Sequence, residues 1–240
     1  MQPSLSVFVP AYNAAETIRD VIARIPDNTW QIIEAVHVID DGSTDDTARV
    51  AKALEQEYPK VHVHSLQRNQ GYGEAVRQGM KRCLASGGDY VACLHADGQY
   101  PPEQLHEFVE QMHSRRIDVL QGSRHKGGSA LAGGMPFYKY MAGKCLTWFE
   151  NKVFGLRMTD YHSGFLVYSR RALLVVPIDL LSAYFDFDLE FIAWASRKGL
   201  VIDELAIPTR YAGEVSHLNP IWYGLRALGV MGKYLTRRYG

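Results

Sequence analysis

Acidic and amide side chains stand directly after short apolar runs of this chain. Two adjacent carboxylates, Asp40 and Asp41, follow one such run, and Asp97 and Gln99 follow another. Adjacent carboxylates repel each other, so a cluster of them needs a cation or hydrogen-bond donors to offset its charge. An ionised carboxylate accepts N–H and O–H donors such as those of a base or a ribose. We therefore expect these residues to bind a nucleotide.

Asp97 and Gln99 alternate along the sequence, so an extended backbone can project two oxygen ligands from one stretch. Mg²⁺ and Mn²⁺ favour such sites, in which one or two carboxylates, waters and substrate phosphate oxygens share the cation. For His95 three roles are open: a third ligand, a hydrogen-bond donor to the nucleotide, or a histidine buried in the core. Asp40 and Asp41 have an alternative of their own, a turn that opens a helix, where the helix dipole favours acids.

Two glycines, Gly71 and Gly73, follow a third apolar run. The next glycine is Gly79, so the dinucleotide fingerprint GxGxxG is incomplete, and no convincing acid stands about twenty residues further on. A nicotinamide oxidoreductase is therefore disfavoured. Glycines that let the start of a helix pack closely against another segment explain the pattern equally well.

The elements that must position these residues alternate between strand-like and helix-like patterns. Leu105, Phe108, Val109 and Met112 recur at helical spacing, and Ser43 with Asp46 predicts a capping box for a helix at about 45–57. Further helices are expected at about 136–155 and 186–198. The predicted strands are Leu5–Val9, Ala35–Ile39, Val61–His64, Tyr90–Leu94, Ile117–Leu120, Phe165–Tyr168 and Leu200–Ile202.

Strands separated by helices predict an α/β fold with a mostly parallel central sheet flanked by helices. Ligands of such sheets bind beyond the carboxyl ends of the strands, so five successive strand ends bring their polar residues to one edge. We expect one domain over residues 1–215. Residues 216–240 then form an amphipathic helix that packs on the domain or lies on a membrane surface. Its two faces carry Ile221, Leu225, Leu228 and Leu235 on one side and Arg226, Lys233 and Arg237 on the other.

The composition of the chain excludes some classes of binding partner. The 240 residues are 47% hydrophobic and carry 26 basic and 26 acidic side chains, so the chain is neither a disordered segment nor a general nucleic-acid binder. Three cysteines without a CxxC pair favour a reducing compartment. We find no signal-peptide pattern and no long apolar stretch, and so expect a cytoplasmic protein, bound at most to the surface of a membrane.

Taken together, these residues resemble the family 2 glycosyltransferases, which have the GT-A nucleotide-sugar fold. The resemblance is strongest to the branch that contains dolichyl-phosphate mannose synthase and bacterial polyprenyl-phosphate glycosyltransferases. Each matching segment is short, but their order and spacing between residues 9 and 190 are specific. The segments are Val9–Asn13, Ile39–Asp45, Asn69–Ala75, Ala96–Pro101, Gly122–Arg124, Asp160–Phe165 and Phe187–Glu190.

The resemblance implies an inverting, metal-dependent hexosyl transfer from a UDP- or GDP-linked sugar, with Mg²⁺ or Mn²⁺. Asp97 matches the last acid of the family's DxD element, and Gln99 matches a further metal ligand. His95 replaces the first acid, and imidazole suits Mn²⁺ better than Mg²⁺. Asp41 is expected to bind the nucleobase. The nucleotide-binding set is Pro10, Ala11, Tyr12, Asn13, Asp40, Asp41, Gly71, Ala96 and Asp97.

The acceptor decides the remaining chemistry. A hydroxyl acceptor needs a general base, whereas an acceptor phosphate is already ionised and needs only cations to hold it. The chain lacks the Glu-Asp doublet in the region where hydroxyl-acceptor relatives carry their base; Asp203-Glu204 has the reverse order. Arg124, Lys139 and Arg210 are available to grip phosphate, although each is also compatible with a solvated surface charge.

We therefore expect a polyprenyl phosphate acceptor, with Asp97 and Arg124 as the catalytic residues and Asp188 and Glu190 as fallback bases. Glu190 lies one turn after Asp186, so these two acids can share a helix face. Transfer to a saccharide hydroxyl and a degenerate nucleotide-binding module without turnover are the alternatives. A lipid acceptor would be reached at the membrane surface, by peripheral contact or through a membrane-protein partner.

Overall fold

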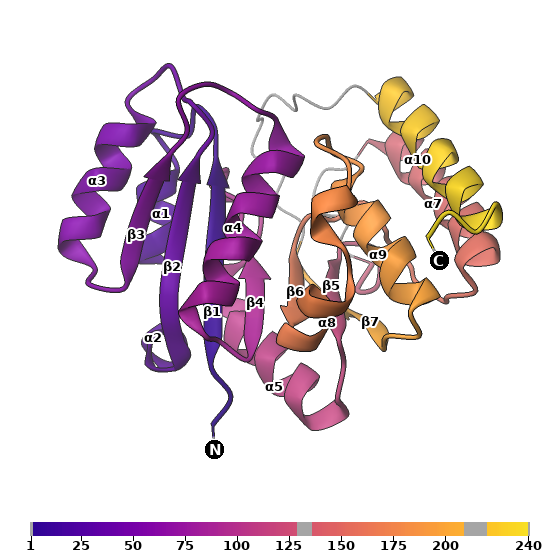
Figure 1. Ribbon diagram of the computed structural model, residues 1–240, viewed down its shortest axis with the longest axis horizontal. Coiled ribbons are helices and arrows are strands. Elements are labelled where there is room, and N and C mark those ends of the chain that lie inside the picture. Colours follow the sequence, from indigo (N-terminus) through magenta and orange to yellow (C-terminus); the bar gives the residue numbers. More distant parts are fainter. Residues whose placement is uncertain (1, 129–135, 209–219, 240) are drawn as a thin grey trace.

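A seven-stranded sheet forms the centre of the computed structural model, which describes residues 2–128, 136–208 and 220–239. The strand order in this part of the chain is β3-β2-β1-β4-β6-β5-β7 (Figure 1). Only β6 runs antiparallel to its neighbours, so the prediction of a mostly parallel sheet is confirmed. The strands are β1 (Leu5–Ala11), β2 (Ile33–Asp40), β3 (Val61–Ser65), β4 (Tyr90–Cys93), β5 (Val119–Ser123), β6 (Leu166–Ser169) and β7 (Ile202–Ala206).

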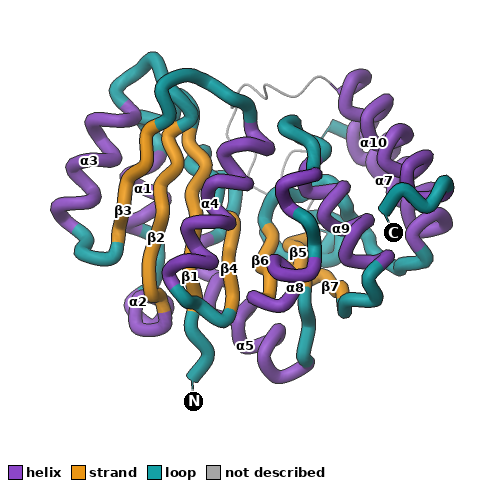
Figure 2. Tube along the Cα trace, viewed as in Figure 1, coloured by secondary structure: helices purple, strands orange, loops and turns teal. Residues whose placement is uncertain are grey.

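Helices cover both faces of the sheet (Figure 2). Apolar side chains of α1, α3 and α5 pack on one face, and those of α4, α8 and α9 pack on the other. The helices are α1 (Ile18–Ala23), α2 (Asp27–Ile32), α3 (Thr47–Glu57), α4 (Tyr72–Ser86), α5 (Leu105–Arg115), α7 (Phe137–Phe154), α8 (Arg170–Val175), α9 (Phe187–Arg197) and α10 (Pro220–Leu235), with short 3₁₀ turns at Pro102–Gln104 and Ile178–Leu180.

The sequence of β1 explains its central place. Val7 and Val9 join the core on one face while Phe8 joins the core on the other, which is the near-continuous apolar run expected of a parallel strand buried on both sides. Helix α4 crosses β1 closely because Gly79 has no side chain: a Cβ there would lie 2.5 Å from the Phe8 ring.

The carboxyl ends of the parallel strands meet at one edge, as expected. Ala11 at the end of β1 pairs with Asp40 at the end of β2, and the N–H of Asp41 donates to the Ala11 carbonyl at 2.8 Å. This register places the first two polar loops side by side before any side-chain contact is considered.

The predicted capping box is wrong. Helix α3 starts at Thr47, and the Ser43 hydroxyl accepts from the N–H of Asn13 at 3.0 Å, a loop residue 30 positions earlier. Asp45 instead accepts from the N–H of Thr47 at 2.9 Å. Ser43 therefore joins two loops at the carboxyl edge and does not cap the helix.

Helix α10 packs against α7 and α9 with the face opposite to the one that its pattern suggested. Ala227, Val230 and Met231 are buried. The leucines of the predicted apolar face are 54–66% exposed. The side chain of Ile221 lies outside the described part of the structure. The exposed leucines are Leu225, Leu228 and Leu235.

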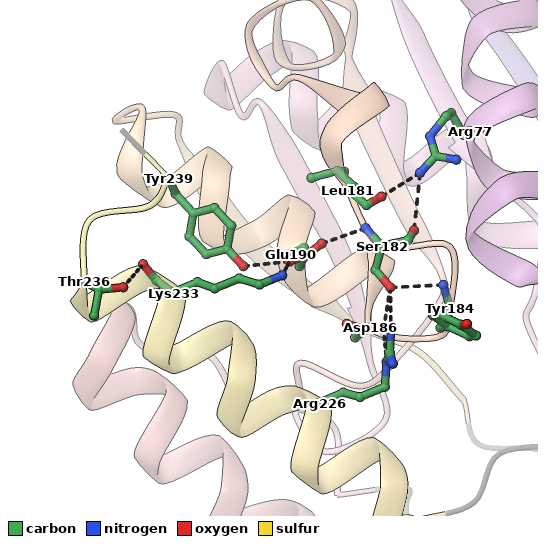
Figure 3. A network of polar contacts seen from close by, with 10 residues as sticks. All are labelled: Arg77, Leu181, Ser182, Tyr184, Asp186, Glu190, Arg226, Lys233, Thr236 and Tyr239. Atoms are coloured by element: carbon green, nitrogen blue, oxygen red, sulfur yellow. Dashed lines mark hydrogen bonds and ion pairs between the residues drawn. The ribbon is translucent and has the colours of Figure 1, made fainter.

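The reason for this orientation lies in the first turn of α9. Asp186 accepts from Arg226 Nε at 2.7 Å and Glu190 accepts from Lys233 Nζ at 2.5 Å (Figure 3). Both acids are buried, so basic side chains of α10 have to face them. This pairing confirms that Asp186 and Glu190 share a helix face. Within the described ranges, none of the helices is both long enough and apolar enough to cross a bilayer.

Replacing Lys233 by Met keeps the apolar stem and leaves Glu190 buried without its cation. We expect a loss of about 1–3 kcal/mol in the free energy of unfolding, below the full value for a buried pair because Lys233 is half-exposed. Urea unfolding measures it. The control is Lys52→Met, which breaks the exposed pair with Glu55 and should change stability by less than about 0.5 kcal/mol. Equal losses in the two variants would contradict the assignment.

Candidate active site

Asp41 is held at the carboxyl edge by backbone donors. Its Oδ1 accepts from the N–H of Gln70 at 2.7 Å and its Oδ2 from the N–H of Gly71 at 2.9 Å. Burial raises the pKa of the Asp41 carboxyl above its usual value, against the two N–H bonds, which lower it. Each oxygen keeps a further lone pair, so Asp41 can still accept a hydrogen bond from an N–H group of a nucleobase.

The neighbouring loops fix one another. Asp40 is buried and accepts from the N–H of Ser43 at 3.0 Å, so this carboxylate closes a turn, as its structural alternative predicted. Asn13 adopts a left-handed backbone with φ of 50° and accepts from the N–H of Thr44 at 2.9 Å. Pro10 and Ala11 end β1 and Tyr12 follows it; Ala11 is buried, and Tyr12 is 40% exposed. The predicted nucleoside residues thus lie at the ends of two paired strands or directly after them: Pro10, Ala11, Tyr12, Asn13, Asp40 and Asp41.

Asp97 and Gln99 follow β4 at the same edge. The Gln99 N–H donates to Asp97 Oδ1 at 3.0 Å, both residues are half-buried, and Ala96 between His95 and Asp97 is buried. No group of three His, Cys, Asp or Glu side chains that could hold a metal alone occurs in the described ranges. One carboxylate, one amide oxygen and one imidazole fit a divalent cation that substrate phosphate oxygens also ligate.

His95 is fixed by its neighbours. Its Nε2 lies 3.2 Å from the Tyr72 hydroxyl, and Gly164 packs on the same ring edge, where a Cβ would come within 2.5 Å of Nε2. Burial lowers the pKa of His95, against the charge of Asp97 and a hydrogen bond to the Gly164 backbone. The imidazole is therefore neutral at pH 7 and retains one nitrogen lone pair for a ligand.

Asp188 lies behind this pair. It is 7% exposed, and its Oδ2 accepts from the Tyr72 hydroxyl at 2.7 Å, while Oδ1 accepts from Tyr168 at 3.5 Å. Burial raises the pKa of Asp188 to about 7, although both tyrosine bonds lower it. Asp188 thus connects to His95 through Tyr72.

The sequence analysis did not predict Tyr72 as a site residue, because it interpreted only the two glycines on either side of it. The expectation that these glycines allow close packing is confirmed: the N–H of Gly73 donates to the Ala183 carbonyl at 3.0 Å, and a Cβ on Gly73 would lie 2.4 Å from the Ser182 carbonyl oxygen. Gly71 has a φ of 96°. An aromatic residue between two glycines at a helix start was the available signal.

Arg124 follows β5 and packs beside the Asp160 segment. Its Nη2 donates to the His162 carbonyl at 3.2 Å, and its Nε lies 3.6 Å from Asp160 Oδ2. Burial alone would raise the pKa of Asp160, but the charges of Arg124 and His162 hold it below its usual value. Of the other predicted phosphate-binding residues, Lys139 belongs to α7 with its side chain outside the described set, and Arg210 lies outside the described residues.

Glu150 is a buried acid that sequence reasoning also missed. Its Oε2 lies 3.4 Å from His162 Nε2, and the Nδ1 of His162 lies 2.9 Å from the Tyr223 hydroxyl of α10. Burial and the charge of Asp160 raise the pKa of Glu150 to about 8, while burial lowers that of His162 to about 4. The proton therefore resides on Glu150 at neutral pH. The signal was a single acid in an otherwise apolar and basic helix.

Glu190 is not brought together with the other predicted site residues. Its carboxylate accepts from Lys233, from the Tyr239 hydroxyl at 2.8 Å and from the N–H of Ser182 at 2.7 Å (Figure 3). Lys233 and Tyr239 bond Oε1 and the Ser182 N–H bonds Oε2, so both oxygens are occupied. The structure thus places Glu190 in the contact between α9 and α10.

The carboxyl edge therefore gathers two carboxylates, Asp41 and Asp97, with the imidazole of His95 and the guanidinium of Arg124. The sequence model of Glycosyl transferase family 2 matches residues 6–175. The chain belongs to this family. A second acid from the family's DxD element is absent, because His95 stands in its place.

Named relatives and solved structures agree with this assignment. The chain is 26% identical over 217 residues to a UDP-N-acetylglucosamine–dolichyl-phosphate N-acetylglucosaminyltransferase of Methanococcus voltae, covering 85% of each chain. It is 28% identical over 200 residues to an undecaprenyl-phosphate mannosyltransferase of Micrococcus luteus, covering 83% of this chain and 80% of the other.

Among solved structures, glucosyl-3-phosphoglycerate synthase of Mycobacterium tuberculosis, determined with Mn²⁺ and UDP-glucose, superposes with a TM-score of 0.70 at 22% identity. The alignment covers 98% of this chain and 79% of that one. The likeness confirms the GT-A fold that the resemblance implied.

The pKa of Glu150 makes stability depend on pH. The folded state keeps a proton that the unfolded chain releases above its ordinary pKa of 4.5, so the stability that this proton contributes is present below 4.5 and lost as the pH rises toward 8. Glu150→Gln cannot titrate. Relative to the wild type, we expect the variant to gain about 2–4 kcal/mol between pH 4.5 and pH 8 in urea unfolding. The exposed Glu110→Gln serves as control, and a pH-independent difference for Glu150→Gln would contradict the assignment.

Proposed function

We propose that this protein transfers a hexose, with inversion, from a UDP- or GDP-linked sugar to a polyprenyl phosphate. The observation that carries the proposal is the convergence of Asp41 with Asp97 and His95 at one sheet edge of a family 2 glycosyltransferase. The names of the two relatives, both lipid-phosphate transferases, support the acceptor.

The donor would lie along the carboxyl edge. Asp41 would accept a hydrogen bond from the nucleobase, and the loops after β1 and β2, which are bonded to each other, would flank the nucleoside. Asp97, Gln99 and His95 would hold Mg²⁺ or Mn²⁺, the two cations with which structures of the mycobacterial neighbour were determined. When bound, the cation neutralises the charge that develops on the diphosphate leaving group.

The surroundings of the acids favour a phosphate acceptor. A hydroxyl acceptor needs an accessible base, but both oxygens of Asp188 face tyrosine hydroxyls, and those of Glu190 accept from Lys233 and from the Ser182 N–H. A phosphate oxygen attacks the sugar without giving up a proton. Arg124, beside the Asp160 segment, would orient it, and Lys139 and Arg210 remain proposed partners of the same phosphate. Transfer to a saccharide hydroxyl would have to use Asp188.

Asp97→Asn keeps the side chain's size but removes the charge that holds the cation. We expect kcat/KM for sugar transfer to a short-chain polyprenyl phosphate to fall about 10²–10³-fold, and Mn²⁺-assisted UDP binding to be lost in isothermal titration. Glu16→Gln, at an exposed acid, is the control. Retained turnover would remove Asp97 from the mechanism, and nucleotide binding without any turnover by the wild type would favour the degenerate module.

The outer face of α7 and α10 suggests how a lipid substrate is reached. Seven of its large apolar side chains are 49–69% exposed, and two of them are tryptophans. Exposed apolar side chains that gather on one surface mark interaction sites, and Trp and Tyr concentrate at membrane interfaces. These residues are Phe137, Tyr138, Trp148 and Phe149 on α7, and Trp222, Leu225 and Leu228 on α10.

The charges on the same two helices support a peripheral membrane role. The only acid in their sequences is Glu150, which is buried, while Lys144 and Lys152 of α7 carry positive charge, with Lys152 exposed. Basic side chains beside apolar ones favour anionic lipid headgroups. We therefore propose that this face lies on the membrane that contains the acceptor.

Trp148→Ser combined with Leu225→Ser removes two exposed apolar groups from this face. We expect the fraction bound to vesicles of phosphatidylcholine and phosphatidylglycerol to fall about tenfold in a sedimentation assay, because each buried side chain contributes on the order of 1 kcal/mol or more. Leu174→Ser on α8, where the leucine is 68% exposed, is the matched control and should bind like the wild type. Equal binding by all three proteins would rule the face out.

A further inference from the structure

Tyr72 is a rigid link between three parts of the site. It opens α4 directly after Gly71, whose N–H is bonded to Asp41 at 2.9 Å. Its ring stacks on Phe185 with centroids 5.2 Å apart and planes at 17°, and the next residue, Gly73, is bonded to the Ala183 carbonyl. The phenol therefore has one fixed position, between His95 and Asp188.

The hydrogen bonds of Tyr72 determine which nitrogen of His95 carries the proton. The phenol has a single proton, and when Asp188 is ionised, above its pKa of about 7, the phenol donates this proton to Asp188 Oδ2 at 2.7 Å. Its oxygen can then only accept at His95, 3.2 Å away, so Nε2 has to be the protonated nitrogen. Gly164 packs against the Nε2–Cε1 edge of the same ring and helps to fix its orientation. Nδ1 is left with its lone pair.

We propose that Tyr72 and Asp188 are positioning residues that fix the His95 ring with its proton on Nε2, so that Nδ1 ligates the divalent cation bound with the donor diphosphate. In many metal sites a carboxylate accepts the free N–H of the ligating histidine, and here a phenol is inserted between the two groups. A nitrogen ligand in place of a carboxylate favours Mn²⁺ over Mg²⁺. The inference rests on the proposed function and gives Asp188 a different role from that of a base.

The proton's place can be measured in the wild-type protein without metal. Long-range ¹H–¹⁵N spectra of protein labelled with ¹⁵N-histidine distinguish the two neutral tautomers, and loss of a signal in His95→Asp identifies the residue. We expect the Nε2–H form at pH 8. The Nδ1–H form would overturn the proposal, whatever the activity of the enzyme.

The positioning role is tested by the affinity for Mn²⁺ in the presence of UDP, followed by electron paramagnetic resonance of the free ion. Tyr72→Phe keeps the ring and its stacking but removes the hydroxyl, and we expect the Kd for Mn²⁺ to rise about 10–100-fold. Tyr168→Phe removes the other phenol on Asp188, which does not contact His95, and should change the Kd less than about twofold. In His95→Asp the ratio of Mn²⁺ to Mg²⁺ affinity should fall, because a carboxylate suits Mg²⁺.

The outcomes separate this inference from the proposed function. If the wild type binds no Mn²⁺ with UDP, the proposed function fails. If the wild type binds and Tyr72→Phe binds equally well, or Tyr168→Phe loses as much, only the positioning role fails. Melting curves of both variants show whether the fold is kept, and the tautomer measurement stands even if Tyr72→Phe does not fold.

Discussion

Burial of carboxylates in and beside the carboxyl edge of the sheet is the constraint on which the rest of the structure depends. Removing a charged group from water is expensive, so each buried acid has to find donors, find a cation or keep its proton. Asp41 takes two backbone N–H groups, Asp160 takes the charge of Arg124, and Glu150 keeps its proton. The loops and helices around the site supply these donors, this cation and the buried surroundings that keep the proton on Glu150.

The same constraint explains how the C-terminal helix sits on the domain. Asp186 and Glu190 are buried at the start of α9, and basic side chains of α10 neutralise them. Turning the basic side inward turns leucines and a tryptophan outward, against the usual rule for an amphipathic helix on a core. One electrostatic requirement inside the protein thus produces an apolar surface outside it, beside the aromatic face of α7. Such a surface suits a transferase whose acceptor is a lipid.

The chemistry of the site follows from which acids remain accessible. Asp188 and Glu190 accept hydrogen bonds from groups inside the protein on both oxygens. The half-buried Asp97 keeps the capacity to ligate a cation. Asp188 contacts His95 through Tyr72, which follows the Gly71 N–H that is bonded to Asp41. A phosphate acceptor needs no base, which fits a site whose deeper carboxylates are occupied.

The sequence alone determined the strands, most helices and the shared edge, because alternation of apolar runs with helical periods is local and parallel strands must end together. It also located Asp41 and Asp97 through segments whose order and spacing are specific. Only the tertiary structure decided the partner of Ser43, the inward face of α10 and the contacts of Tyr72, Asp188 and Glu150. Those depend on contacts between residues far apart in the chain, such as Tyr72 with Asp188, where burial and available donors, rather than local pattern, select the partner.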